Sequence, residues 1–89
     1  MDEMVTELVT RLGIENARVY FNRENKPAGI LDMSSGIGFE LPELNEKTIE
    51  KCAQDFETLK NVKNTTFSVS SSIYFFEKEL GFGDNFIDF

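Results

Sequence analysis

The spacing of apolar residues predicts a helix at the start of the chain and another after its midpoint. Residues 2–12 carry an apolar stripe at helical period, and Arg11 lies in the last turn, where a cation complements the helix dipole. Gly13 follows as a C-terminal stop. Asn45 is a suitable N-cap for the second helix. Its apolar positions recur at i, i+3, i+4, i+7 and i+10, namely Ile49, Cys52, Ala53, Phe56 and Leu59.

Three strands are predicted between these helices, over residues 17–22, 28–33 and 37–41. The first run alternates, which indicates a strand with one buried side. The connections between the runs are too short for a parallel crossover, so neighbouring strands must be antiparallel. We expect Ala17, Val19 and Phe21 on the buried side of the first strand and Arg18, Tyr20 and Asn22 on the other.

The last quarter of the chain is harder to assign. Residues 65–70 are rich in β-forming side chains and favour a further strand. Residues 72–80 fit either a continuation of that strand or a short helix that ends at Gly81. The sequence therefore predicts an α+β fold with one domain over residues 1–89: an N-terminal helix, a three-stranded antiparallel meander, a second amphipathic helix, then a further strand and an aromatic C-terminal segment.

Composition restricts where such a protein works. The chain has 89 residues, 40% of them hydrophobic and nine of them Phe, which is enough to build a core without crosslinks. Cys52 is the single cysteine, whereas small secreted domains usually carry several. No apolar run approaches the ~20 residues that span a bilayer, and no signal-peptide pattern begins the chain. We expect a cytoplasmic protein that does not engage membranes.

The residue inventory argues against an enzyme. The chain has no His, the side chain used most often for proton transfer at neutral pH, and one Cys cannot build a zinc site. Asp32 and Glu40 are conceivable hydrolytic carboxylates, but solvated strand positions explain them more simply. Gly36–Gly38 and Gly81–Gly83 lack the Lys-Ser/Thr of a phosphate loop and are read as turns. We expect no catalytic residues, metal or cofactor.

The C-terminal segment leaves two interpretations open. Its aromatic rings are interleaved with the carboxylates of Glu77, Glu79, Asp84 and Asp88. In one interpretation the rings fold back and close the core, as a domain of this size needs. In the other, they form an acidic–aromatic segment that docks into apolar pockets with a basic rim on a partner.

Charge gives the function hypothesis. Sixteen Asp and Glu oppose nine Lys and Arg, a net charge of −7, which repels nucleic acid and favours a protein partner with a basic surface. In size and charge the chain is similar to phage-encoded inhibitors of host defence nucleases, including anti-CRISPR proteins and DNA mimics. This similarity implies a non-enzymatic inhibitor that occupies a basic nucleic-acid-binding site.

The alternative is a structural or adaptor protein acting as a homodimer or through its C-terminal segment. The predicted contact residues are Glu40, Glu43, Glu46, Glu50, Glu57, Glu77, Glu79, Asp84, Phe86, Asp88 and Phe89.

Overall fold

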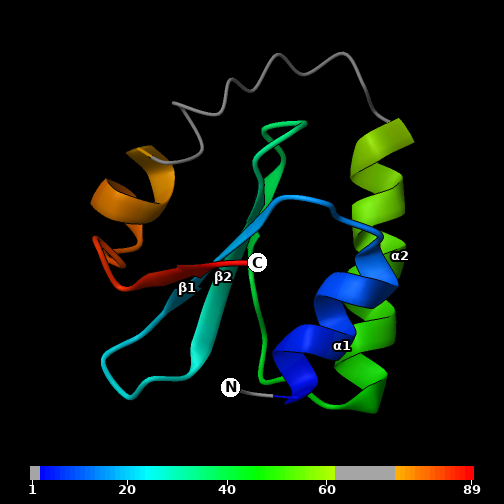
Figure 1. The fold of residues 1–89 in the computed structure, drawn as a ribbon, viewed down its shortest axis with the longest axis horizontal. Coiled ribbons are helices and arrows are strands. Elements are labelled where there is room, and N and C mark those ends of the chain that lie inside the picture. The colour runs from blue at the N-terminus through cyan, green and yellow to red at the C-terminus, as the bar shows by residue number, and fades with distance from the viewer. Residues whose placement is uncertain (1–2, 62–73) are drawn as a thin grey trace.

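The computed structural model describes residues 3–61 and 74–89 (Figure 1). Within them, the elements in chain order are helix α1, strands β1, β2 and β3, helix α2, a short π-helical turn η1 and strand β4. The strands form one antiparallel sheet in the order β3-β2-β1-β4. This arrangement confirms the predicted α+β fold. The bounds are α1 Glu3–Leu12, β1 Ala17–Phe21, β2 Pro27–Asp32, β3 Gly38–Glu40, α2 Glu46–Asn61, η1 Phe75–Glu79 and β4 Phe86–Asp88.

Local side-chain chemistry sets the ends of both helices. Asn45 is the N-cap of α2, as predicted: its Oδ1 accepts hydrogen bonds from the N–H groups of Lys47 at 3.0 Å and Thr48 at 3.1 Å. The Thr48 hydroxyl in turn accepts a bond from the Asn45 N–H at 2.8 Å, so that each residue satisfies a backbone donor of the other. Gly13 follows α1 with a φ of 68°, a conformation that favours glycine and ends the helix.

Both faces of the sheet are covered. Helices α1 and α2 lie on one side and η1 lies on the other (Figure 1). The core under the helices contains side chains from both helices and from alternate strand positions such as Val19 and Ile30. A second cluster on the opposite face contains Tyr20, Leu31 and Phe76, all fully buried. The prediction that β1 has one buried side is therefore wrong, because the C-terminal segment covers the side assigned to solvent.

Two glycines make the close approach of η1 possible. A methyl group built at Gly29 in β2 would lie 2.7 Å from Phe76 Cε1, and one at Gly38 in β3 would lie 2.7 Å from Phe76 Cε2. The ring of Phe76 thus rests directly on the backbone of two neighbouring strands, at positions where any side chain would displace it. It also stacks on Tyr20, with ring centroids 4.8 Å apart.

In the last quarter of the chain, the structure decides between the strand and the helix considered for residues 74–79 and contains an additional strand. Residues 74–79 are helical rather than extended. Strand β4 was not predicted, and it pairs antiparallel with β1, with Val19 opposite Ile87. The strand predicted over residues 65–70 lies outside the described residues, as do positions 72 and 73. No helix of the described ranges is both long and apolar enough to cross a membrane.

Candidate protein-binding surface

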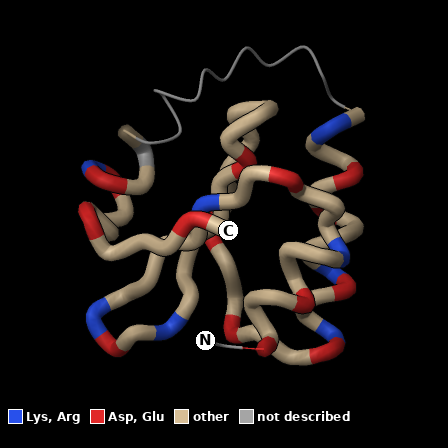
Figure 2. Tube along the Cα trace, in the orientation of Figure 1, with Lys and Arg blue, Asp and Glu red and all other residues tan. Residues whose placement is uncertain are grey.

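The predicted contact residues lie on separate parts of the surface. We name Glu46, Glu50 and Glu57 the α2 flank, because they lie on one side of that helix. Glu40 is the last residue of β3, and Glu43 lies in the segment between β3 and α2. The remaining set comes from η1, the following loop and β4, and consists of Glu77, Glu79, Asp84, Phe86, Asp88 and Phe89. Figure 2 shows acidic residues along both helices and the C-terminal segment, with basic residues interspersed on α2 and on the β1–β2 hairpin.

The α2 flank is the most regular group. Its three members are exposed and follow at i, i+4 and i+11, which keeps them within about 40° around the helix and spreads them over about 16 Å along its axis. Glu57 lies 3.9 Å from the Lys60 ammonium, and both side chains are well exposed. Such a pair contributes little, about 0.3–0.5 kcal/mol. The flank therefore presents a row of carboxylates that an external cation can reach.

Glu40 and Glu43 line a cavity of about 530 Å³. The cavity joins the β1–β2 hairpin, through Lys26, to the residues after β3 and to Phe82 of the C-terminal segment. The Lys26 ammonium lies 4.0 Å from a Glu24 carboxylate, and both groups are exposed. The lining combines apolar side chains with charges of both signs, so it does not select one ligand.

Asp88 already has an intramolecular partner. The Arg18 guanidinium donates two hydrogen bonds to its carboxylate, at 2.7 and 3.1 Å, and lies 4.0 Å above the Phe86 ring. The hydrogen bond from Arg18 holds the pKa of Asp88 below its usual range. Arg18 thus attaches β4 to β1, and the charge of Asp88 is largely neutralised at this site.

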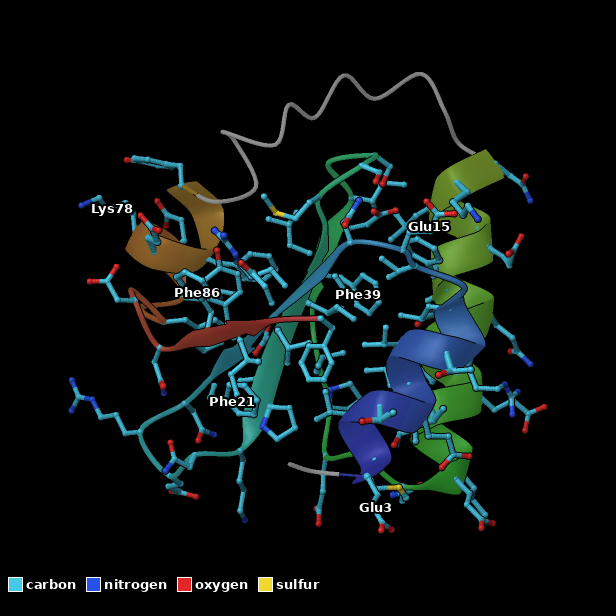
Figure 3. The ribbon with its side chains drawn as sticks, viewed as in Figure 1. Glu3, Glu15, Phe21, Phe39, Lys78 and Phe86 are labelled. Atoms are coloured by element: carbon cyan, nitrogen blue, oxygen red, sulfur yellow. The ribbon has the colours of Figure 1, made fainter. Side chains whose placement is uncertain are left out.

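The other aromatic members of the set also contact the sheet. Phe86 lies on the η1 side, whereas Phe39 lies on the helix side (Figure 3). The ring centroids of Phe86 and Tyr20 are 5.6 Å apart. Phe89 packs against the core under the helices, and its N–H donates to the Ala17 carbonyl at 2.7 Å. The exposed acids Glu79 and Asp84 are therefore the members of this set most accessible to a partner.

Substituting Asp88 tests the link to Arg18. We expect Asp88→Asn to lower the free energy of unfolding at neutral pH by about 0.2–1 kcal/mol, because the pair is partly exposed. The folded-state pKa of Asp88 is lowered, so its contribution is present above the unfolded value of about 3.9 and is lost as the pH falls further. Urea unfolding at neutral pH and near pH 3 should show a smaller acid loss for the variant than for the wild type. Equal losses would contradict the pairing.

Tyr20 is a central residue that sequence reasoning assigned to solvent. Its ring is fully buried, and its hydroxyl lies near Arg18 and Glu77 but has no partner at hydrogen-bonding geometry in the part of the chain that the structure describes. Burial is the main cause that raises the pKa of this phenol. One sequence signal was available, because Tyr20 faces Gly29 across the ladder, and a glycine in a strand often marks close packing from above.

Of the two carboxylates considered for hydrolysis, Glu40 is an exposed strand position, as expected, whereas Asp32 is buried, so its assignment as a solvated position is wrong. The Asp32 carboxylate accepts hydrogen bonds from the Ser34 N–H at 3.0 Å and the Ser35 hydroxyl at 2.9 Å, and so stabilises the turn between β2 and β3. Cys52 is buried in the helix-side core, and burial raises the pKa of its thiol. Among residues 3–61 and 74–89, no three His, Cys, Asp or Glu side chains are placed to hold a metal ion.

Comparison with known proteins adds no family to this description. No protein-family model matches the chain, and the searches of curated proteins and of solved structures found no match either.

Proposed function

We propose that this protein is a non-enzymatic inhibitor whose acidic surface occupies a basic, nucleic-acid-binding site on another protein in the cytoplasm. The α2 flank carries the proposal. Its carboxylates span about 16 Å on a rigid helix, and one strand of duplex DNA carries a phosphate every 3.4 Å or so along the helix axis. A row of fixed anions of this kind can take the place of phosphates opposite Lys and Arg side chains. In its finer form the proposal is a DNA mimic of the phage anti-defence or anti-CRISPR type.

Two observations favour this surface over the C-terminal segment. Phe76, Phe82 and Phe86 pack around Tyr20 on the sheet, which leaves less aromatic surface for docking into a partner. The α2 flank, in contrast, is exposed over its whole length. The backbone of a capped helix is already ordered, so binding restricts only the Glu side chains, and such preorganisation improves affinity.

A matched pair of variants tests the proposal. In the first, Glu46, Glu50 and Glu57 are all changed to Gln. In the second, Glu3, Glu7 and Glu15, which are also exposed, are changed to Gln, so that both variants lose the same charge. We expect the wild type, immobilised at low salt, to retain basic nucleic-acid-binding proteins from a bacterial lysate, and duplex DNA to release them. The α2-flank variant should bind them about ten- to a hundredfold more weakly, from about 0.5–1 kcal/mol for each lost contact.

The control variant separates position from net charge. It should retain the same proteins within about threefold of the wild type, because it alters total charge but leaves the α2 flank unchanged. Equal weakening in both variants would show that only net charge matters. Failure of duplex DNA to compete would show that the retained proteins are not held through their nucleic-acid sites. Either result would overturn the proposal.

A further inference from the structure

Among residues 3–61 and 74–89, strand β4 forms one edge of the sheet. The Phe89 N–H donates to the Ala17 carbonyl at 2.7 Å, and the Phe21 N–H donates to the Asn85 carbonyl at 2.8 Å. Backbone groups alternate sides along an antiparallel strand. The N–H and carbonyl groups of Asp88 and the carbonyl of Phe86 therefore point away from β1, on the free side of the edge. Such groups form a template on which another strand can pair.

An exposed apolar side chain lies at the centre of this edge. Among the described residues, the large apolar side chains that remain exposed are Leu59, Tyr74 and Ile87, and Ile87 is the one that lies in a strand. It is 40% exposed although it stands opposite the buried Val19. A strand added beside β4 would place a side chain next to Ile87, and such cross-strand pairs stabilise a sheet.

The charge around β4 specifies the kind of strand. Residues 74–89 carry four carboxylates, from Glu77, Glu79, Asp84 and Asp88, against the one ammonium of Lys78. Arg18 offsets Asp88 alone. A second copy of this chain would bring the same acids, and a net charge of −7, to the same edge, and like charges across an interface are unfavourable. A basic segment would be attracted instead.

From the backbone groups of β4 that no described residue pairs, the exposed Ile87 and the excess of carboxylates in residues 74–89, we propose that β4 binds an extended segment of a partner protein with alternating basic and apolar residues, which adds to the sheet as a further strand. Main-chain hydrogen bonds supply the affinity in this mode, and alternate side chains supply the selectivity. This surface is separate from the α2 flank, so each proposal stands or falls by its own experiment.

The test uses a short synthetic peptide of alternating lysine and valine, with a glutamate–valine peptide as the charge-reversed probe. Binding to the full chain is followed through backbone amide shifts and hydrogen exchange by NMR. We expect the lysine peptide to shift the amides of residues 86–88 and to slow exchange at Asp88 at least about fivefold, the factor that corresponds to about 1 kcal/mol for a new hydrogen bond there. The glutamate peptide should leave these signals unchanged.

Two substitutions at one position isolate the backbone donor. Asp88→Ala and Asp88→Pro both remove the link to Arg18, but only proline also removes the outward N–H. Proline is tolerated on the free side of an edge strand, and thermal unfolding of the two variants gives the check that both fold. We expect Asp88→Ala to bind the lysine peptide within about threefold of the wild type and Asp88→Pro to bind it about tenfold more weakly.

Several results would overturn the proposal. Equal loss of binding in both variants would show that the carboxylate alone holds the peptide. Shifts confined to β3, the opposite edge, would place the binding elsewhere. Concentration-dependent association of the free protein by sedimentation, with protection at Asp88, would make a second copy the occupant of the edge. Because the α2-flank variant with Glu46, Glu50 and Glu57 changed to Gln leaves β4 intact, it should bind the lysine peptide as the wild type does.

Discussion

Replacing Phe76 with alanine is expected to lower the free energy of unfolding by about 3–5 kcal/mol, the usual cost of removing a fully buried aromatic ring. The ring is 0% exposed, stacks on Tyr20 at 4.8 Å and lies 6.0 Å from Phe82. Its loss would leave a cavity above Gly29 and Gly38, which have no side chains of their own to fill the space. Urea unfolding followed by circular dichroism measures the change. A domain of this size is usually stable by only about 4–13 kcal/mol.

Three further variants keep this prediction testable if the alanine variant does not fold. Phe76→Leu retains most of the volume and should cost less than Phe76→Ala. Tyr74→Ala is the matched control, because Tyr74 is 59% exposed, and it should change stability by no more than about 0.5 kcal/mol. Gly29→Ala should cost about 1–3 kcal/mol in the wild type through its clash with the rings of Phe76 and Phe82. It should cost less in the Phe76→Leu background, where the closer of the two contacts is relieved, because the residues are coupled. Additive effects would contradict the contact.

Deleting residues 84–89 is expected to lower the free energy of unfolding by several kcal/mol, because it removes two partly buried aromatic rings, each worth up to about 1.5–3 kcal/mol when fully buried, together with the pairing to β1. The deletion removes strand β4 and the link between Arg18 and Asp88. It also removes Asn85, whose side-chain amide donates to the carbonyls of Phe21 and Asn22 at 2.9 and 3.1 Å. Thermal unfolding should show a fall of about 4–8 °C for each kcal/mol.

Asn85→Ala is the milder form of the same experiment. It removes only the two side-chain hydrogen bonds and should lower the free energy of unfolding by about 1–3 kcal/mol. If the truncated protein stays within about 1 kcal/mol of the wild type, the C-terminal rings do not belong to the core, and the docking interpretation of this segment would be preferred. A large loss would support the packed arrangement.

The helices and the meander were predictable because their signals are local. The apolar spacing from Ile49 to Leu59, the Asn45 cap and the short connections between strands each act within a few residues. Strand β4 was not predictable in this way, because its hydrogen bonds join Ala17 to Phe89. No residue pattern near the C-terminus indicates that pairing. The position of Tyr20 was misread for the same reason: the side chain that buries it, Phe76, is far away in the sequence.

The same difference between local and long-range signals applies to the predicted contact residues. Exposure of the α2 flank followed from helical period, since Ile49, Cys52 and Phe56 define a buried face that lies about 110° around the helix from it. The role of Asp88 could not be predicted from the sequence, because its partner Arg18 lies in a strand that is adjacent only in the folded chain. Acidic residues near a chain end are readily read as partner contacts, and only tertiary structure reveals which of them serve the protein itself.

The two-sided sheet has a consequence for biosynthesis. Leu31 and Phe76 belong to one cluster, and a ribosome adding about 5–20 residues per second needs about 2–9 s to extend the chain from one to the other. During that interval β1 and β2 have emerged, but Tyr20 and Leu31 have no cover. The nascent chain therefore exposes an apolar sheet face for seconds, long enough for a chaperone to bind or for neighbouring chains on a polysome to aggregate.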